Sequence, residues 1–216
     1  MSATTKLDFV SDVSCPWCAI GLQSLLAALS NLRDVVDAEL HFQPFELNPD
    51  MGPGGQDIVE HIAQKYGPSP EQFAQSQEMI RARGAQLGFR FDMQKRTRIY
   101  NTFDAHRLLH WAALEGKQLE LQQALFSAYF TDGADPSDHE TLARIAAQVG
   151  LDPAAAQAVL ETDRYGAEVR ARERFYGSQG INGVPAVIIN DRHLVEGGQP
   201  VAVFERVLRQ FAERLS

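Results

Sequence analysis

Cysteine, long apolar runs and clusters of positive charge are all scarce in this sequence. Only two of the 216 residues are cysteine, so the core of a chain this long must form without disulfide staples. No stretch approaches the ~20 apolar residues of a transmembrane helix, and we expect no membrane span. The net charge is −8, and Lys and Arg gather only in short runs at 95–98 and 170–174. We interpret both runs as solvated surface and expect neither nucleic acid nor membrane partners.

The N-terminal segment also lacks the apolar stretch of a secretory signal peptide. Residues 1–5 are polar, and a strand-like pattern that includes Asp8 begins at Lys6. We therefore expect a cytoplasmic protein. In that compartment glutathione keeps most thiols reduced, so a cysteine pair is more often catalytic or metal-binding than structural.

The apolar periodicity predicts an α/β fold interrupted by a helical block. Runs that alternate or are continuously apolar predict strands, and apolar residues at helical spacing predict helices. The predicted strands lie at 6–11, 39–43, 184–190 and 193–196, with helices at 16–32 and from 200 onward. The stretch between the second and third strands is almost entirely helical in pattern. We predict one domain formed by 1–50 plus 180–216 and a helical insertion domain formed by 51–179.

The two cysteines lie three residues apart, in Cys15-Pro16-Trp17-Cys18, between the first predicted strand and the first predicted helix. Pro16 suits the first position of a helix, which makes Cys15 the N-cap. There the unpaired backbone N–H groups and the helix dipole favour a thiolate, the nucleophile of disulfide exchange. We predict Cys15 as the exposed attacking thiol and Cys18, one turn into the helix, as the more buried resolving thiol.

A zinc site and two incidental buried cysteines are the alternatives to a redox pair. Zinc normally takes four ligands, so at least two would have to come from histidine. The six histidines of the chain are His41, His61, His106, His110, His139 and His193. None completes a Cys-x-x-Cys…His-x-x-x-His pattern with the cysteine pair at the spacing typical of a zinc site. We favour redox chemistry and predict no metal and no cofactor beyond the cysteine pair itself.

Three motifs resemble those of a known family. They are residues 11–18 around the cysteine pair, residues 101–108 (Asn-Thr-Phe-Asp-Ala-His-Arg-Leu) and residues 183–190, which begin Gly-Val-Pro. With the order of strands and helices, they resemble the FrnE-like group of DsbA-family oxidoreductases. The resemblance implies an α/β thioredoxin-like fold with a large all-helical insertion after the second strand. It also implies that Val184-Pro185 is a cis peptide facing Cys15, where substrate pairs with the backbone before the proline.

Further candidates for substrate binding lie in or beside these motifs. Trp17 is expected at the rim of the active site. Asn101, His106 and Arg107 are candidates for the cleft between the insertion and the cysteines. His106 and His110 lie one turn apart on a predicted helix and share a face. The alternative is an interface role in which neighbouring groups satisfy these side chains.

The chain departs from the family at one position. Thioredoxins and DsbA carry a buried carboxylate six residues before the first cysteine, which helps to move the proton of the resolving thiol. Here that residue is Phe9. Asp8 is expected on the opposite face of the strand, because side chains alternate. Asp12, three residues before Cys15, is the candidate proton relay, with an Asx-turn role as the equal alternative.

The leading hypothesis is a cytoplasmic disulfide reductase or isomerase that acts on protein or small-molecule disulfides through a mixed disulfide on Cys15. The resemblance leaves open a second class, glutathione-dependent enzymes of the kappa transferase or 2-hydroxychromene-2-carboxylate isomerase type. Those enzymes carry Ser where this chain has Cys15. Glutathione is accordingly a candidate co-substrate. A third class is a non-catalytic binding module that uses the insertion as a docking surface.

Overall fold

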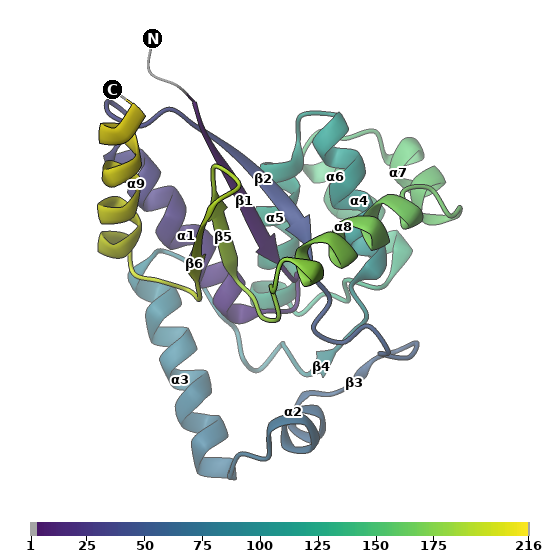
Figure 1. Ribbon diagram of the computed structural model, residues 1–216. Helices are drawn as coiled ribbons and strands as arrows, with labels where there is room; N and C mark the ends of the chain where they lie inside the picture. The colour runs from purple at the N-terminus through teal and green to yellow at the C-terminus, as the bar shows by residue number, and fades with distance from the viewer. Residues whose placement is uncertain (1–3, 216) are drawn as a thin grey trace.

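A single mixed sheet lies at the centre of the computed structural model (Figure 1), which describes the backbone of residues 4–215 and the side chains of 4–212. Most of the polar N-terminal segment, residues 1–3, falls outside that range. The strand order is β2 (Ala38–Pro44), β1 (Thr5–Ser11), β5 (Ala186–Ile189) and β6 (His193–Glu196). β1 is parallel to β2 and antiparallel to β5, and β5 is antiparallel to β6.

β1 is buried on both faces because its side chains alternate between two apolar cores. Leu7 and Phe9 belong to the main core, which α1 (Pro16–Asn31) and α9 (Val201–Leu215) cover. Val10 packs on the other face with Tyr176 of α8 (Gly166–Ser178). Figure 1 shows α1 and α9 together at one side of the sheet. The helix that begins with the cysteine pair is thus held directly against the central strand.

The insertion between β2 and β5 consists of helices and one short strand pair. Its elements are β3 (Gln56–Asp57), α2 (Ile58–Tyr66), α3 (Pro70–Gln86), β4 (Arg98–Ile99), α4 (Phe103–Leu114), α5 (Gln118–Ser127), the π-helical turn η1 (Ala128–Asp132), α6 (His139–Gln148), α7 (Pro153–Leu160) and α8. The pair β3–β4 is antiparallel and was not predicted. Two residues per strand are too few to show the alternation that identifies a strand in a sequence.

The insertion packs in two parts. Helices α4 to α7 enclose a core of their own, which includes Leu108 and Leu142. Ile80 of α3 and Phe130 of η1 instead enter the main core with Phe9. The sheet order and the helical insertion confirm the predicted α/β thioredoxin-like fold. The division into two domains stays a prediction. Within residues 4–215, no helix combines the length and apolarity needed to cross a membrane.

Candidate active site

The two cysteines lie at the start of α1. Cys15 is the N-cap, with φ −88° and ψ 112°, and Pro16 occupies the first turn. An extended backbone is what a proline imposes on the residue before it, so the local sequence accounts for this geometry. Both cysteines are free thiols. The predicted N-cap position of Cys15 is confirmed.

The loop before β5 brings a second segment against the first cysteine. The Val184–Pro185 peptide bond is cis, as the resemblance implied. The Sγ of Cys15 lies 3.7 Å from the carbonyl oxygen of Val184. Gly21 allows this approach, because a Cβ at its position would lie 3.1 Å from the Cγ of Pro185. Residues 169 apart in the sequence therefore meet at Cys15.

Cys18 is the inner thiol of the pair, with no exposed surface. Burial raises the pKa of the Cys18 thiol well above its ordinary value, and contact with Cys15 adds to the shift. Asp12 has two smaller and opposed effects on this pKa, because a hydrogen bond with its backbone lowers the pKa and its charge raises it. The Cys18 thiol is therefore protonated at pH 7.

Cys15 is less exposed than the sequence predicted, at 4%. Residues of the insertion line a partly open cavity of about 440 Å³ in front of it. We call this cavity the Cys15 chamber. Residues 14–17 and Val184 line one side, and α2 and α3 line the other with side chains such as Phe73. Trp17 lies in the wall beside Cys15.

Arg96 contradicts the interpretation of residues 95–98 as solvated surface. It is 8% exposed and lines the Cys15 chamber. Its Nη2 donates to the carbonyl oxygen of Ser14 at 3.2 Å, and its guanidinium packs over the rings of Tyr129 and Phe130. These rings come from a helical segment far later in the chain. No local pattern therefore indicates that Arg96 turns inward, and the sequence reasoning missed it.

Asp12 is buried and forms the Asx turn that was the alternative to a proton relay. One carboxylate oxygen accepts from the N–H of Ser14 at 3.0 Å, and the other accepts from the N–H of Leu47 at 2.6 Å. The carboxylate also lies 4.0 Å from the Nε2 of His106. Asp12 thus fixes the loop before the cysteines, and its role as a proton relay stays a prediction.

Asp8 lies on the opposite face of β1, as strand alternation predicted. Its carboxylate accepts from the Nε2 of Gln43 at 2.6 Å and pairs with the Nζ of Lys6 at 2.9 Å. On that face of the sheet, burial raises the pKa of the Tyr176 hydroxyl to about 12, and the charge of Asp8 is the second cause of the shift. Phe9, the next residue, instead shares the main core with both cysteines. The sheet therefore separates Asp8 from the redox pair.

The structure places Asn101 and His106 outside the Cys15 chamber. The Oδ1 of Asn101 accepts from the N–H of Phe103 at 2.9 Å, and its Nδ2 donates to the carbonyl oxygen of Pro49 at 3.3 Å. Asn101 thus holds the start of α4. The Nε2 of His106 lies 3.1 Å from the carbonyl oxygen of Phe45. Neither residue is among the described residues that line the chamber, and their contacts match the alternative interface role.

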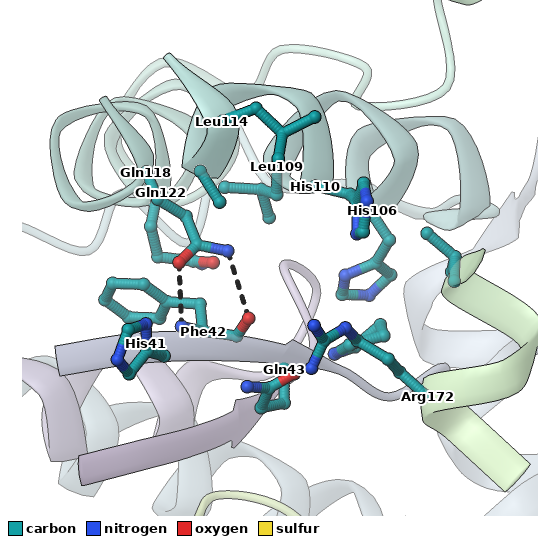
Figure 2. Close-up of a pocket in the computed structure, with 13 residues that line it drawn as sticks. His41, Phe42, Gln43, His106, Leu109, His110, Leu114, Gln118, Gln122 and Arg172 are labelled. Carbon is teal, nitrogen blue, oxygen red and sulfur yellow. Dashed lines mark hydrogen bonds between the residues drawn. The ribbon is translucent and has the colours of Figure 1, made fainter. Parts of the chain in front are cut away.

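His106 and His110 share a face, as predicted, and border a second pocket of about 100 Å³. Figure 2 shows this pocket between β2 and the helices α4 and α5, with Arg172 of α8 at its edge. Burial lowers the pKa of both histidines, so the neutral ring predominates at pH 7. The amide of Gln122 is buried here without a hydrogen-bond partner among the described residues. Nowhere in the described chain do three His, Cys, Asp or Glu side chains gather as a metal site.

A group of buried charges lies behind Asp12, and the sequence reasoning missed it. The Nη1 of Arg170 lies 2.6 Å from the carboxylate of Glu46 and 2.8 Å from that of Glu173. We call Asp12, Glu46, Glu173 and Arg170 the acid cluster. Burial, and then the charge of Glu173, raise the pKa of Glu46 to about 8, so the cluster holds a proton at pH 7. The run 170–174, interpreted above as surface, therefore supplies one arginine to a partly buried ion pair.

Comparison with known proteins gives a family match over most of the chain. A sequence model of the DSBA-like thioredoxin domain matches residues 6–209. The uncharacterized protein YwbO of Bacillus subtilis (strain 168) is 27% identical over 206 residues, which are 95% of this chain and 96% of that protein. The probable DsbA oxidoreductase SCO1869 from Streptomyces coelicolor is 33% identical, with a TM-score of 0.90 over 97% of this chain and 90% of that one.

Two more distant structures share the fold. The isomerase for 2-hydroxychromene-2-carboxylate is 16% identical, with a TM-score of 0.72 over 98% of this chain and 100% of that one. The cytosolic disulfide reductase DsbM from Pseudomonas aeruginosa, solved with GSH, is 18% identical, with a TM-score of 0.63 over 97% of this chain and 98% of that one. At these identities the likeness concerns the fold alone.

Proposed function

Because the chain belongs to the DSBA-like thioredoxin domain family, we propose that it is a thiol–disulfide oxidoreductase whose redox centre is Cys15 and Cys18. The observation that carries the proposal is the meeting of Cys15, at the N-terminus of α1, with the carbonyl of Val184 at 3.7 Å. The positive end of the helix dipole stabilises a thiolate at that position. The motifs at 11–18, 101–108 and 183–190 support placement in the FrnE-like group of this family.

The reaction consists of two exchange steps. The Cys15 thiolate attacks one sulfur of a disulfide, a mixed disulfide forms on Cys15, and the first half of the substrate leaves as a thiolate. Cys18 then loses its proton and attacks the Cys15 sulfur, which releases the second half and forms the Cys15–Cys18 disulfide. The substrate gains two electrons and the protein loses two. A thiol reductant, for which glutathione is the candidate, restores the dithiol.

Asp12 is our candidate for the group that accepts the Cys18 proton. It is buried in the loop that leads to Cys15, where its carboxylate accepts from the N–H of Ser14 at 3.0 Å. Moving the proton from Cys18 to Asp12 shifts one negative charge from carboxylate to thiolate without adding a second buried charge. A second buried charge would be strongly disfavoured. Asp8 is excluded from this role by its position on the other face of the sheet.

We propose reduction or isomerisation in the cytoplasm as the direction of the reaction. Cytoplasmic glutathione favours reduced thiols, so a dithiol there acts mainly as an electron donor. The shared fold with the cytosolic reductase DsbM, whose structure contains GSH, supports glutathione as the co-substrate. The substrate would pair with the backbone of Val184 as an added strand, next to Trp17.

A glutathione-dependent isomerase is the second candidate. The shared fold with the isomerase for 2-hydroxychromene-2-carboxylate and the enclosed chamber in front of Cys15 favour it. Turnover of a chromene carboxylate that requires added glutathione and survives Cys18→Ser would support this candidate. Absence of turnover at any glutathione concentration would contradict it.

The direct test mixes the reduced protein with hydroxyethyl disulfide, a small neutral disulfide, and separately with insulin. We expect the wild type to reduce at least one of them, with electrons supplied by dithiothreitol. Cys15→Ser should lose the activity, whereas Cys18→Ser, the matched variant one turn away, should stop at the mixed disulfide. A wild type no faster than Cys15→Ser with both disulfides would contradict the proposed function and favour a non-catalytic binding module.

A further inference from the structure

The Cys15 chamber has the size of a small-molecule site. Its volume of about 440 Å³ lies within the ~300–1,000 Å³ of typical ligand pockets. Figure 1 shows α2 and α3 as an arm that stands off the sheet beside the start of α1. The chamber is the space that this arm encloses. A small disulfide is of a size that this volume can hold.

The chamber wall is mostly apolar and free of carboxylates. Ile62 and Phe73 of the arm lie across the chamber from Trp17. No Asp or Glu is among the described residues that line it, although the chain contains 28 of them and has a net charge of −8. The chamber has one histidine, His61, and burial lowers its pKa, so it is neutral at pH 7. This wall suits an aromatic group and does not repel an anion.

Arg96 is the one charged side chain among the described residues of the chamber wall. It is 8% exposed, it forms no ion pair within the described chain, and its Nε is buried without a hydrogen-bond partner. A buried cation without a counter-charge is unfavourable, and an anion carried by a ligand offsets that cost. The chamber wall therefore complements a ligand that is mostly apolar and carries one negatively charged group.

The position of Arg96 links this anion to the reacting sulfur. Its Nη2 donates to the carbonyl of Ser14, the residue before Cys15, at 3.2 Å. The rings of Tyr129 and Phe130 lie 5.2 and 5.1 Å from the guanidinium carbon and hold it in place. A carboxylate close to the substrate disulfide can thus reach Arg96 while the disulfide meets Cys15.

We propose that the substrates are low-molecular-weight disulfides of aromatic thiols that carry a carboxylate. This inference rests on the proposed thiol–disulfide exchange and adds its substrate class. The aromatic ring packs against the arm, the carboxylate pairs with Arg96, and the disulfide faces Cys15. Cys15 attacks the disulfide and one aryl thiolate leaves. Cys18 then displaces the second, so that both aryl thiols are released and the protein ends as the Cys15–Cys18 disulfide.

The experiment measures the rate at which the reduced protein reacts with disulfides that differ in charge and bulk. The probes are 5,5′-dithiobis(2-nitrobenzoate), which is aromatic and carries carboxylates, 4,4′-dithiodipyridine, which is aromatic and neutral, and cystamine, which is small and cationic. Insulin represents a protein disulfide. Each rate is divided by the rate of the same disulfide with free 2-mercaptoethanol, a neutral thiol, at the same pH, which removes differences in leaving-group quality without adding a charge preference. We expect the highest ratio for the nitrobenzoate.

Three variants separate charge recognition from a structural role. Arg96→Met should lower the nitrobenzoate ratio by about tenfold, the size expected when one charged hydrogen bond is lost, and change the dithiodipyridine ratio less than twofold. Arg96→Lys should retain most of the nitrobenzoate ratio. The matched control is Arg81→Met, whose exposed side chain on α3 pairs with Glu78 and should leave every ratio unchanged. Ser76→Trp fills the chamber from α3 and should lower both aromatic ratios but not that of cystamine.

Each outcome decides between specific explanations. Equal ratios for all disulfides, or the highest ratio for insulin, would overturn the substrate class while leaving the exchange activity in place. An equal loss on every probe in Arg96→Met would show a structural role for that residue. If Arg96→Met does not fold, as judged by circular dichroism, Arg96→Lys and Ser76→Trp still give the answer. Failure of all probes to react through Cys15 would instead contradict the proposed function itself.

Discussion

Two buried regions of opposite electrostatic character lie on either side of segment 45–47. On one side Leu47 lines the Cys15 chamber, where Arg96 is the charged residue of the described wall. On the other side Glu46 belongs to the acid cluster, where the carboxylates of Glu46 and Glu173 share the guanidinium of Arg170. The N–H of Leu47 donates to Asp12 of that cluster. Little more than the backbone of segment 45–47 therefore separates the two regions.

The contrast follows from what disulfide exchange requires. A carboxylate close to a thiolate disfavours the thiolate, so the space in which Cys15 meets its substrate benefits from having none. The resolving thiol has the opposite need, because its proton must be taken up by a basic group. Asp12, with its charge acting on Cys18, lies where the acid cluster comes nearest to the redox pair. The proposed anion site at Arg96 and the proposed proton acceptor Asp12 thus lie on different sides of segment 45–47.

The largest effect is expected from Asp12→Asn, which removes the proposed proton acceptor. The second step, release of thiol from the mixed disulfide, should slow by about a hundredfold, the lower end of effects seen when a general base is lost. The first step should change little. Stopped-flow measurement of the two phases with an aromatic disulfide checks this. Asp8→Asn is the matched control, a buried acid on the other face of β1, and an equal slowing in both variants would rule out a specific role for Asp12.

A smaller effect is expected from Gly21→Ala, which tests the contact between α1 and the Val184–Pro185 loop. The added Cβ would lie 3.1 Å from the Cγ of Pro185 and 3.4 Å from the Cα of Gly198. We expect the free energy of unfolding to fall by ~1–3 kcal/mol, as in other overpacked cores, and Cys15 to react more slowly. The matched control is Gly177→Ala, where nothing lies within 4 Å of the new Cβ. Because alanine has the better helix propensity, this variant should raise the free energy of unfolding by ~0.5–1 kcal/mol. Urea unfolding measures the change in the free energy of unfolding for both variants. Equal changes would contradict a close contact between Gly21 and the Val184–Pro185 loop.

A third effect, which depends on pH, concerns the proton held by the acid cluster. The pKa of Glu46 is raised to about 8 by burial and then by Glu173, so between about pH 4 and 8 the folded state binds more protons than the unfolded one. The stability this group contributes is complete below about pH 4 and is lost as the pH rises to about 8, by at most ~1.4 kcal/mol per pH unit. Glu46→Gln should remove that slope in urea unfolding at pH 5 to 8. The exposed Glu115→Gln should keep the slope, and a slope unchanged in Glu46→Gln would refute the assignment.

The sequence predicts the parts of the site that depend on neighbouring residues. Pro16 after Cys15 determines both the helix start and the extended cap, and strand alternation places Asp8 away from the cysteines. The cis Val184–Pro185 bond follows from family resemblance and has no local signal of its own. The alternation of apolar residues likewise predicts β1 and α1, because each buries a regular face.

What the sequence does not predict depends on contacts between distant residues. Arg96 lies in a run of charges that resembles surface, and only packing on Tyr129 and Phe130 turns it inward. Glu46 meets Arg170 across 124 residues. The low exposure of Cys15 has the same origin, because α2 and α3 fold back over it from the insertion. The sequence around a charged residue indicates neither whether its side chain is buried nor which residue it pairs with.

The central claim is that Cys15 carries the substrate and Cys18 releases it. The most direct measurement is peptide mass spectrometry, without reductant, of Cys18→Ser after reaction with 5,5′-dithiobis(2-nitrobenzoate) or hydroxyethyl disulfide. The account predicts a stable adduct on Cys15 in this variant and a Cys15–Cys18 disulfide without adduct in the wild type. An adduct found equally on Cys18 of Cys15→Ser, or no adduct on Cys15 at all, would contradict it.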